Sequence, residues 1–186
     1  MSPAALRELA EQAPLRDYQR AANTLEAGRV ARYHAAPTVA PQTVGHHSWG
    51  VAVLCLYVTG GEASRELIIQ ALVHDAAELH TGDVPFTVKR DLPEVKTFFR
   101  DLEAHAHRCL VMDECSLSPH DAAVLKLCDT VEGLIWCRKT ETTGLVRERW
   151  RGALNRAFEK FAGVCSDEEL ARAAELVNEE NFYPTI

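Results

Sequence analysis

Apolar residues recur at helical spacing along almost the whole chain, and no convincing run of alternating β-branched residues interrupts them. Apolar positions three and four residues apart form one face of a helix, whereas a half-buried strand alternates at every second residue. We therefore predict an all-α fold. The predicted helices cover residues 3–12, 16–28, 45–59, 64–80, 93–112, 119–141, 145–162 and 167–180.

Residues that start and stop helices support these boundaries. Gly60–Gly61 ends one predicted helix, Ser64 can cap the next, and Gly82 and Pro85 break it. Ser118–Pro119 opens another helix, because proline is favoured in the first turn. No repeat or Pro/Gly/Ser-rich linker divides the chain, so a single domain over residues 1–186 is predicted.

The composition is that of a globular domain, with 47% hydrophobic and 25% charged residues in a chain of 186. A core of that size folds without a metal or disulfides, so a bound metal would serve function. The cysteines contain no C-x-x-C pair and are expected to be reduced core thiols. They are Cys55, Cys109, Cys115, Cys128, Cys137 and Cys165.

The overall charge narrows the choice of partners. A formal net charge of −7 disfavours a polymeric nucleic acid, but it leaves room for a small anionic substrate in a locally basic pocket. The amino terminus carries no apolar run of the signal-peptide type, and no later segment approaches the roughly 20 apolar residues of a membrane span. We expect a soluble, cytoplasmic protein.

The stretch LVHDAAELHTGD, residues 72–83, places polar groups where helix core is expected. In a continuous helix, Glu78 lies four residues beyond His74 and three beyond Asp75, so the three side chains lean toward one region. Burying a carboxylate costs several kcal/mol unless it is paired or binds a metal. A cation held by His74 and Asp75 explains the pattern, and a buried His–Asp pair that merely joins helices is the alternative.

Two more ligand-type residues occur at apolar positions in other predicted helices. Asp129 lies in AAVLKLCDTVEGLIWC, and His47 opens the apolar helix HSWGVAVLCLYV after a long irregular segment. Two imidazoles and two carboxylates suit one divalent transition ion, of Co, Mn, Zn, Fe or Ni, with room left for water or a phosphate oxygen. Such an unsaturated site is catalytic in type.

The order H…HD…D, here His47, His74–Asp75 and Asp129, resembles that of HD-domain metal-dependent phosphohydrolases. Two longer blocks, RYHAAPTVAPQTVGHHSWGVA and HDAAELHTGDVPFTVK, resemble those of bacterial 5′-deoxynucleotidases and small phage dATP triphosphohydrolases. The resemblance covers roughly residues 29–135 and implies a helical HD-domain bundle. It implies that the four residues hold the metal and that Glu78 is the catalytic acid/base acting on the attacking water.

The same resemblance implies a set of substrate-binding residues. Arg32, Lys89 and Lys126 would face phosphate oxygens, Tyr33 would lie near the sugar, and Asp83 would help to read the deoxyribose. One position departs from the relatives, which usually have Glu before the first metal histidine where this chain has His46. His47 is chosen over His46 because the following Ser48 and the helix register match.

The sequence therefore predicts a metal-dependent hydrolase that cleaves the 5′ phosphoester of 2′-deoxynucleotides, with a deoxynucleoside monophosphate such as dAMP as substrate. A dATP or dNTP triphosphohydrolase that releases triphosphate is the alternative. A non-catalytic metal-binding nucleotide sensor is a further one; Glu78 argues against it, because a sensor needs no proton-transfer group. The resemblance also implies a homodimer or a higher homo-oligomer.

Overall fold

The computed structural model describes residues 17–33, 40–84, 93–110, 116–140 and 145–178. The prediction of an all-α fold is confirmed in these segments, which are helical apart from turns and one short strand pair. The predicted helix at 3–12 lies outside them, and the single domain over 1–186 stays a prediction. The helices are α2 (Asp17–Ala27), α3 (Val44–Val58), α4 (Arg65–Val73), α5 (Glu78–Thr81), α7 (Pro93–Leu110), α8 (Pro119–Thr140), α9 (Leu145–Ala162) and α10 (Asp167–Val177).

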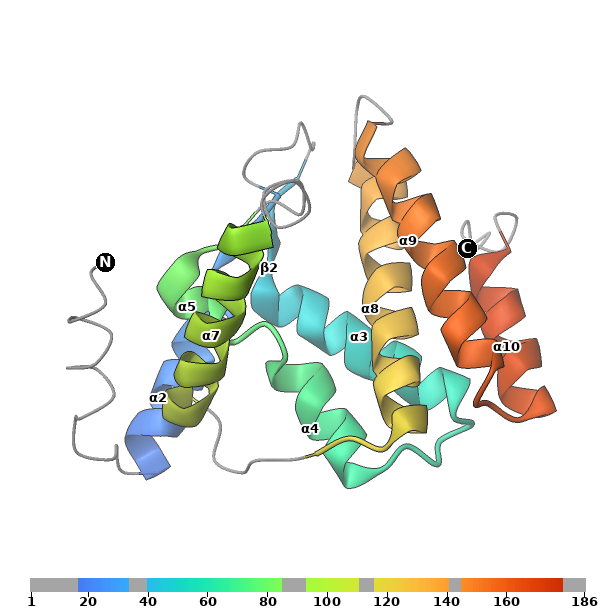
Figure 1. Cartoon of the computed structure of the whole chain (residues 1–186), viewed down its shortest axis with the longest axis horizontal. Helices are drawn as coiled ribbons and strands as arrows, with labels where there is room; N and C mark the ends of the chain where they lie inside the picture. The colour runs from blue at the N-terminus through green and yellow to red at the C-terminus, as the bar shows by residue number, and fades with distance from the viewer. Residues whose placement is uncertain (1–16, 34–39, 85–92, 111–115, 141–144, 179–186) are drawn as a thin grey trace.

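Helix α8 organises the larger part of the fold. It packs along α9 on one side and against α3 and α4 on the other, while α10 also contacts α3 (Figure 1). Leu67, Val51, Leu127, Leu134 and Phe161 are fully buried between these helices. Helices α2, α5 and α7 pack together as a separate group (Figure 1). None of the described helices is both long and apolar enough to cross a membrane.

The cysteines behave as predicted where the structure describes their side chains. Cys55, Cys128 and Cys137 are buried, Cys165 is half-buried, and none of these four forms a disulfide. The side chains of the other two lie outside the described part. Cysteine therefore contributes to packing here, since buried thiols behave as small apolar groups.

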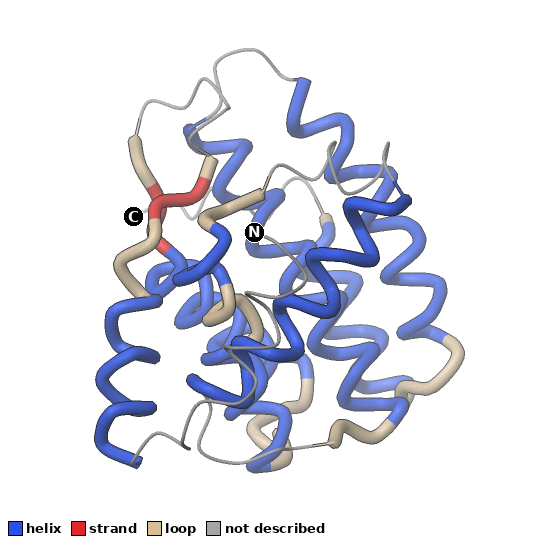
Figure 2. Tube along the Cα trace, turned by 60° about the vertical axis from the view of Figure 1, so that its left-hand side comes forward, coloured by secondary structure: helices blue, strands red, loops and turns tan. Residues whose placement is uncertain are grey.

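A short antiparallel strand pair was not predicted from the sequence. Strand β1 (Ala31–Arg32) pairs with β2 (Gln42–Thr43), with Ala31 opposite Thr43 and Arg32 opposite Gln42. Figure 2 shows this pair in red beside the helices. Two residues are too few to show an alternating pattern, so the apolar periodicity carried no sign of it. The pair buries Arg32 and Gln42 directly before α3.

The continuous helix predicted over 64–80 is wrong in its middle. Helix α4 ends at Val73, residues 74–77 form a turn, and Glu78 starts α5. The N–H groups of Ala76, Glu78, Leu79 and His80 bond to carbonyls three residues back rather than four. This tighter winding turns the chain by about 120° per residue instead of 100°. The side-chain directions expected for a regular helix between His74 and Glu78 therefore do not apply.

The predicted caps of α4 and α8 are present. Ser64 accepts a hydrogen bond from the N–H of Leu67, and Ser118 accepts one from the N–H of Asp121. Each satisfies a backbone donor that the first helical turn leaves without a partner. Ser64 also donates to the Asp121 carboxylate, at 2.8 Å, so the caps join the two helix starts.

His120 extends this junction to α10. Its Nδ1 lies 3.2 Å from Asp121 Oδ1 and its Nε2 lies 3.0 Å from Glu169 Oε1. Partial burial would lower the pKa of His120, but hydrogen bonds with Glu169 and Asp121 outweigh it and raise the pKa above its ordinary value. The imidazolium form therefore holds the first turns of α8 and α10 together.

We expect replacement of His120 by Gln to lower the melting temperature more at about pH 6 than at about pH 9. A raised folded-state pKa gives stability that is present below the unfolded pKa of about 6.5 and lost as pH rises through the folded value. Thermal unfolding of both proteins at the two pH values measures it. His80→Gln, at an exposed histidine of α5, serves as control. An equal loss at both pH values contradicts the assignment.

Candidate metal centre

Three elements bring metal-ligating side chains to one point. His47 lies one turn into α3, His74 and Asp75 lie in the turn after α4, and Asp129 lies in the middle of α8. One ligand atom each from His47, His74 and Asp75 lies within 4.8 Å of the others. Asp129 borders this group, with its Oδ1 3.3 Å from His47 Nε2 and 4.0 Å from His74 Nε2.

The geometry around His47 fits a metal ligand. Its ring is fully buried, and Nδ1 is hydrogen-bonded to Glu132. Nε2 has no hydrogen-bond partner in the described part of the chain and faces Asp129 Oδ1 at 3.3 Å and Asp75 Oδ2 at 3.5 Å. Ligand atoms bound at about 2.1 Å to one ion lie roughly 3.0 to 3.5 Å apart. This nitrogen therefore points to where an ion would sit.

His74 is oriented in a similar way. Its Nδ1 lies 3.0 Å from the carbonyl oxygen of Ala71, so the Nδ1–H tautomer satisfies that bond. Its Nε2 is then left to accept, and it lies 3.5 Å from Asp75 Oδ2. A backbone carbonyl that fixes the tautomer is a common support for a metal-bound histidine.

The carboxylates are held in their ionised form. Burial would raise the pKa of Asp129, but Lys126 and His47 outweigh it and hold the pKa well below the usual value. The pKa of Asp75 is also lowered, because His74, Arg32 and His47 offset its burial. Burial would lower the pKa of His47, but the Asp129 and Glu132 carboxylates beside its two ring nitrogens raise it to about 9. Without an ion, a proton on the His47 imidazole offsets part of the negative charge of these carboxylates, which a cation would otherwise neutralise.

Two predicted phosphate-binding cations contact the carboxylates of the cluster. Arg32, buried in β1, hydrogen-bonds to Asp75 Oδ2. Lys126 Nζ donates to Asp129 Oδ2 at 2.7 Å, although 62% of its side chain is exposed. Burial would lower the pKa of Arg32, but Asp75 and other acids raise it, so the guanidinium stays charged. Lys89, the third cation, lies outside the described residues.

Tyr33 and Asp83 meet at the edge of the site. The backbone N–H of Tyr33 donates to Asp83 Oδ2 at 2.7 Å. Tyr33 has a φ of 58°, in the left-handed region that a bulky residue rarely adopts. Its phenolic oxygen is buried, and burial raises the pKa of the phenol above the usual range. Asp83 thus holds the strained backbone of the residue predicted to lie near the sugar.

Glu78 is close to the cluster but outside its mutually close ligand atoms. It is 9% exposed at the first position of α5, and its charge is among those that raise the pKa of Arg32. Its role as the proton-transfer group stays a prediction.

Glu132 and Gln42 were missed as site residues. Glu132 bonds to His47 Nδ1, and Gln42 Nε2 donates to Glu132 Oε1 at 2.7 Å. The signal was available for Glu132, which lies one turn after Asp129 in the same apolar stretch. His46 is exposed, and its ring packs edge-on against Trp136, with 5.2 Å between centroids. The ring of His46 therefore does not belong to the cluster.

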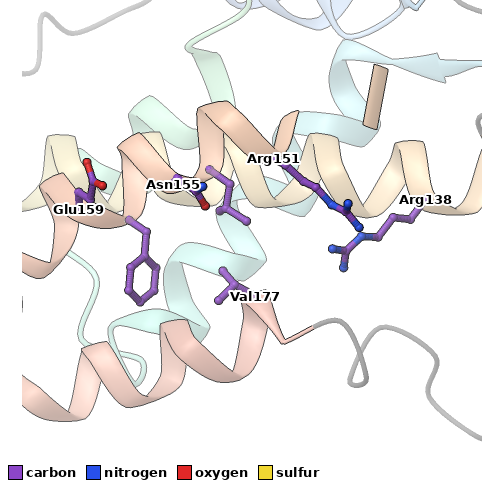
Figure 3. Close-up of a pocket in the computed structure, with 7 residues that line it drawn as sticks. Arg138, Arg151, Asn155, Glu159 and Val177 are labelled. Atoms are coloured by element: carbon purple, nitrogen blue, oxygen red, sulfur yellow. The ribbon is translucent and has the colours of Figure 1, made fainter. Parts of the chain in front are cut away.

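A cavity of about 470 Å³ lies between α8, α9 and α10 (Figure 3). Figure 3 shows Arg138 and Arg151 extending side by side at one end of it, and Val177 reaching in from α10. None of the predicted site residues lines this cavity. The chemistry indicated by the sequence therefore belongs to the histidine–aspartate cluster.

Comparisons with known proteins identify the family of the chain. Residues 22–120, just over half of the chain, match the model of the 5′-deoxynucleotidase YfbR-like family. A dATP triphosphohydrolase of Cyanophage S-2L is 31% identical over 121 residues, which are 61% of this chain and 67% of that protein. A 5′-deoxynucleotidase of Vibrio parahaemolyticus is 33% identical over 92 residues, 45% of this chain and less than half, 47%, of that protein.

The fold also matches a solved structure. This is the HD phosphohydrolase of Cyanophage S-2L, bound to dA and one catalytic Zn²⁺ ion. The TM-score is 0.67, with 24% identity over 86% of this chain and 92% of that one. The prediction of an HD-domain phosphohydrolase from the motifs is confirmed. The chain belongs to the 5′-deoxynucleotidase YfbR-like family of HD-domain phosphohydrolases.

Proposed function

We propose that this protein hydrolyses the 5′ phosphoester of 2′-deoxynucleotides with one divalent ion held by His47, His74, Asp75 and Asp129. The observation that carries the proposal is the convergence of two imidazole Nε2 atoms and two ionised carboxylates at one partly buried point. Supporting it, the matched relatives are a dATP triphosphohydrolase and a 5′-deoxynucleotidase.

A divalent ion at this point would supply Lewis acidity toward a phosphoryl oxygen and toward water. The donor set of two nitrogens and two oxygens fits zinc, and equally cobalt, manganese, iron or nickel. Zinc is our first choice, because the phage phosphohydrolase of similar fold is bound to one catalytic Zn²⁺. We propose Glu78 as the acid/base: its carboxylate accepts a proton from the attacking water and returns one to the leaving oxygen.

Arg32 and Lys126 would neutralise the charge that builds on the phosphoryl oxygens. Lys126 is suited to this, because its exposed side chain can turn from Asp129 toward a substrate. Arg32 is buried against Asp75 and presents its charge from the wall of the site. Lys89 keeps its proposed phosphate role from the sequence resemblance, as Tyr33 and Asp83 keep theirs toward the sugar.

Deoxynucleoside monophosphates, with dAMP first, are the proposed substrates, and dATP is the second candidate. The same ester is cleaved in both cases, releasing phosphate from one and triphosphate from the other. The phage relative favours dATP, since the match to it spans 67% of its length. A homodimer or higher homo-oligomer, implied by the resemblance, and a cytoplasmic location, expected from the sequence, complete the proposal.

We expect Zn²⁺ or Co²⁺, at a free concentration of about 100 times its dissociation constant, to raise the melting temperature of the chelator-treated protein by about 5 to 10 °C. An ion at 100 times its dissociation constant adds about 2.7 kcal/mol to the free energy of unfolding, and 1 kcal/mol shifts a protein of this size by roughly 2 to 4 °C. Thermal unfolding with and without the ion measures it. The shift should vanish in Asp129→Asn, and an undiminished shift there would place the ion elsewhere.

We expect Glu78→Ala to lower turnover by at least about 100-fold, because it removes the proposed proton acceptor, and to leave bound metal unchanged. Release of phosphate from dAMP and of triphosphate from dATP measures turnover, and elemental analysis measures the metal. Glu62→Ala, at an exposed glutamate after α3, is the control. A fully active Glu78→Ala protein contradicts the assignment. Metal binding by the wild type without turnover of any deoxynucleotide favours the sensor.

A further inference from the structure

We propose that Glu132 is a positioning residue for the metal, because it orients His47. Relatives usually have a glutamate directly before this histidine, where this chain has His46, and Glu132 supplies a carboxylate in its place. The inference rests on the proposed metal site, and it is carried by contacts that lie one layer outside it. No role had been assigned to Glu132 from the sequence.

Glu132 is hydrogen-bonded on both oxygens. One oxygen bonds to His47 Nδ1, and the other accepts from Gln42 Nε2 at 2.7 Å. His47 and Gln42 are both fully buried, and Glu132 is 8% exposed. A carboxylate at this depth is expensive unless each oxygen has a donor, so the three side chains form one unit drawn from β2, α3 and α8.

Helix α3 leaves space for this carboxylate. An added Cβ at Gly50 would lie 2.9 Å from Glu132 Cγ, closer than side chains tolerate. Gly50 follows His47 by three residues, so both lie on the face of α3 that meets α8. The missing side chain at position 50 is what lets Glu132 reach the imidazole.

The bond decides which nitrogen of His47 is available. With Nδ1–H donated to the carboxylate, Nε2 keeps its lone pair and points toward Asp75 and Asp129. A carboxylate on the far nitrogen also makes the imidazole a stronger ligand. Helix α8 thereby contributes two residues to the metal site. Asp129 is a proposed ligand, and Glu132, one turn later, orients the ligand His47. Glu132 thus takes the place of the glutamate that relatives usually have before the histidine. His46, which stands there in this chain, has an exposed ring that lies against Trp136.

Glu132→Gln is the sharpest test, because glutamine keeps the shape and loses the charge. The carbonyl of the introduced amide can still accept from His47, and its NH₂ group can donate to Gln42 Oε1 once the Gln42 amide turns over; that oxygen has no partner among the described residues. We expect Co²⁺ affinity to fall about 10- to 100-fold, with an altered visible spectrum of the bound Co²⁺. At saturating metal, kcat should fall while the KM for dAMP stays within about threefold.

Gly50→Ala tests the same unit without changing the carboxylate. The new methyl group should push Glu132 away from His47 and lower Co²⁺ affinity in the same direction. Gly152→Ala in α9 is the matched control, since the nearest atom to an added Cβ there lies 3.7 Å away. For the carboxylate change, Glu175→Gln is the control; Glu175 accepts from Tyr57 at 2.6 Å, away from the cluster.

Wild-type Co²⁺ affinity and an unchanged Co²⁺ spectrum in a folded Glu132→Gln protein would overturn the proposal, as would a Gly50→Ala protein that binds like Gly152→Ala. Loss of folding in Glu132→Gln leaves Gly50→Ala and Glu132→Asp to decide the matter, with partial recovery of affinity expected in the aspartate variant. If metal binding depends on Glu132 but the protein turns over no deoxynucleotide, the proposed function is contradicted and the role of Glu132 stands. A wild-type protein that binds no Co²⁺ would overturn both.

Discussion

The burial of charge at the meeting point of α3, α4 and α8 is the constraint on which the site depends. Asp75 and Asp129 are ionised among apolar helices, and a lone buried carboxylate would cost several kcal/mol. Arg32 pairs directly with Asp75, and Lys126 with Asp129. The Nε2 atom of His47 lies near both carboxylates, and the pKa of this histidine is raised. The strand pair β1–β2 contributes Arg32 to this arrangement.

That constraint explains why the candidate ligands stand out in the sequence. An acid such as Asp129 inside AAVLKLCDTVEGLIWC is visible because its neighbours are apolar and nothing else accounts for it. The helices around it follow from apolar periodicity, and Ser64 and Ser118 marked helix starts correctly. These features depend on residues close together in the chain, where sequence patterns are informative.

What the sequence did not reveal depends on distant contacts or on local winding. No glycine or proline lies at the switch to tighter hydrogen bonding after His74, so the sequence predicted one continuous helix there. The contact of Glu132 with His47 joins residues 85 positions apart. Strand β1 pairs with β2 through two residues each, which leaves no pattern to read. The backbone bond from Tyr33 to Asp83 likewise spans two segments that are adjacent only after folding.

The turn between α4 and α5 separates two duties that one regular helix would have combined. His74 and Asp75 belong to the turn, and the proposed proton carrier Glu78 opens the next element. The proposed metal ligands and the proposed proton carrier therefore lie on different backbone elements. In evolutionary terms, a lineage could lose hydrolysis through one substitution in α5 and keep a pocket that still recognises nucleotide and ion. A fold divided in this way offers a short route from enzyme to receptor.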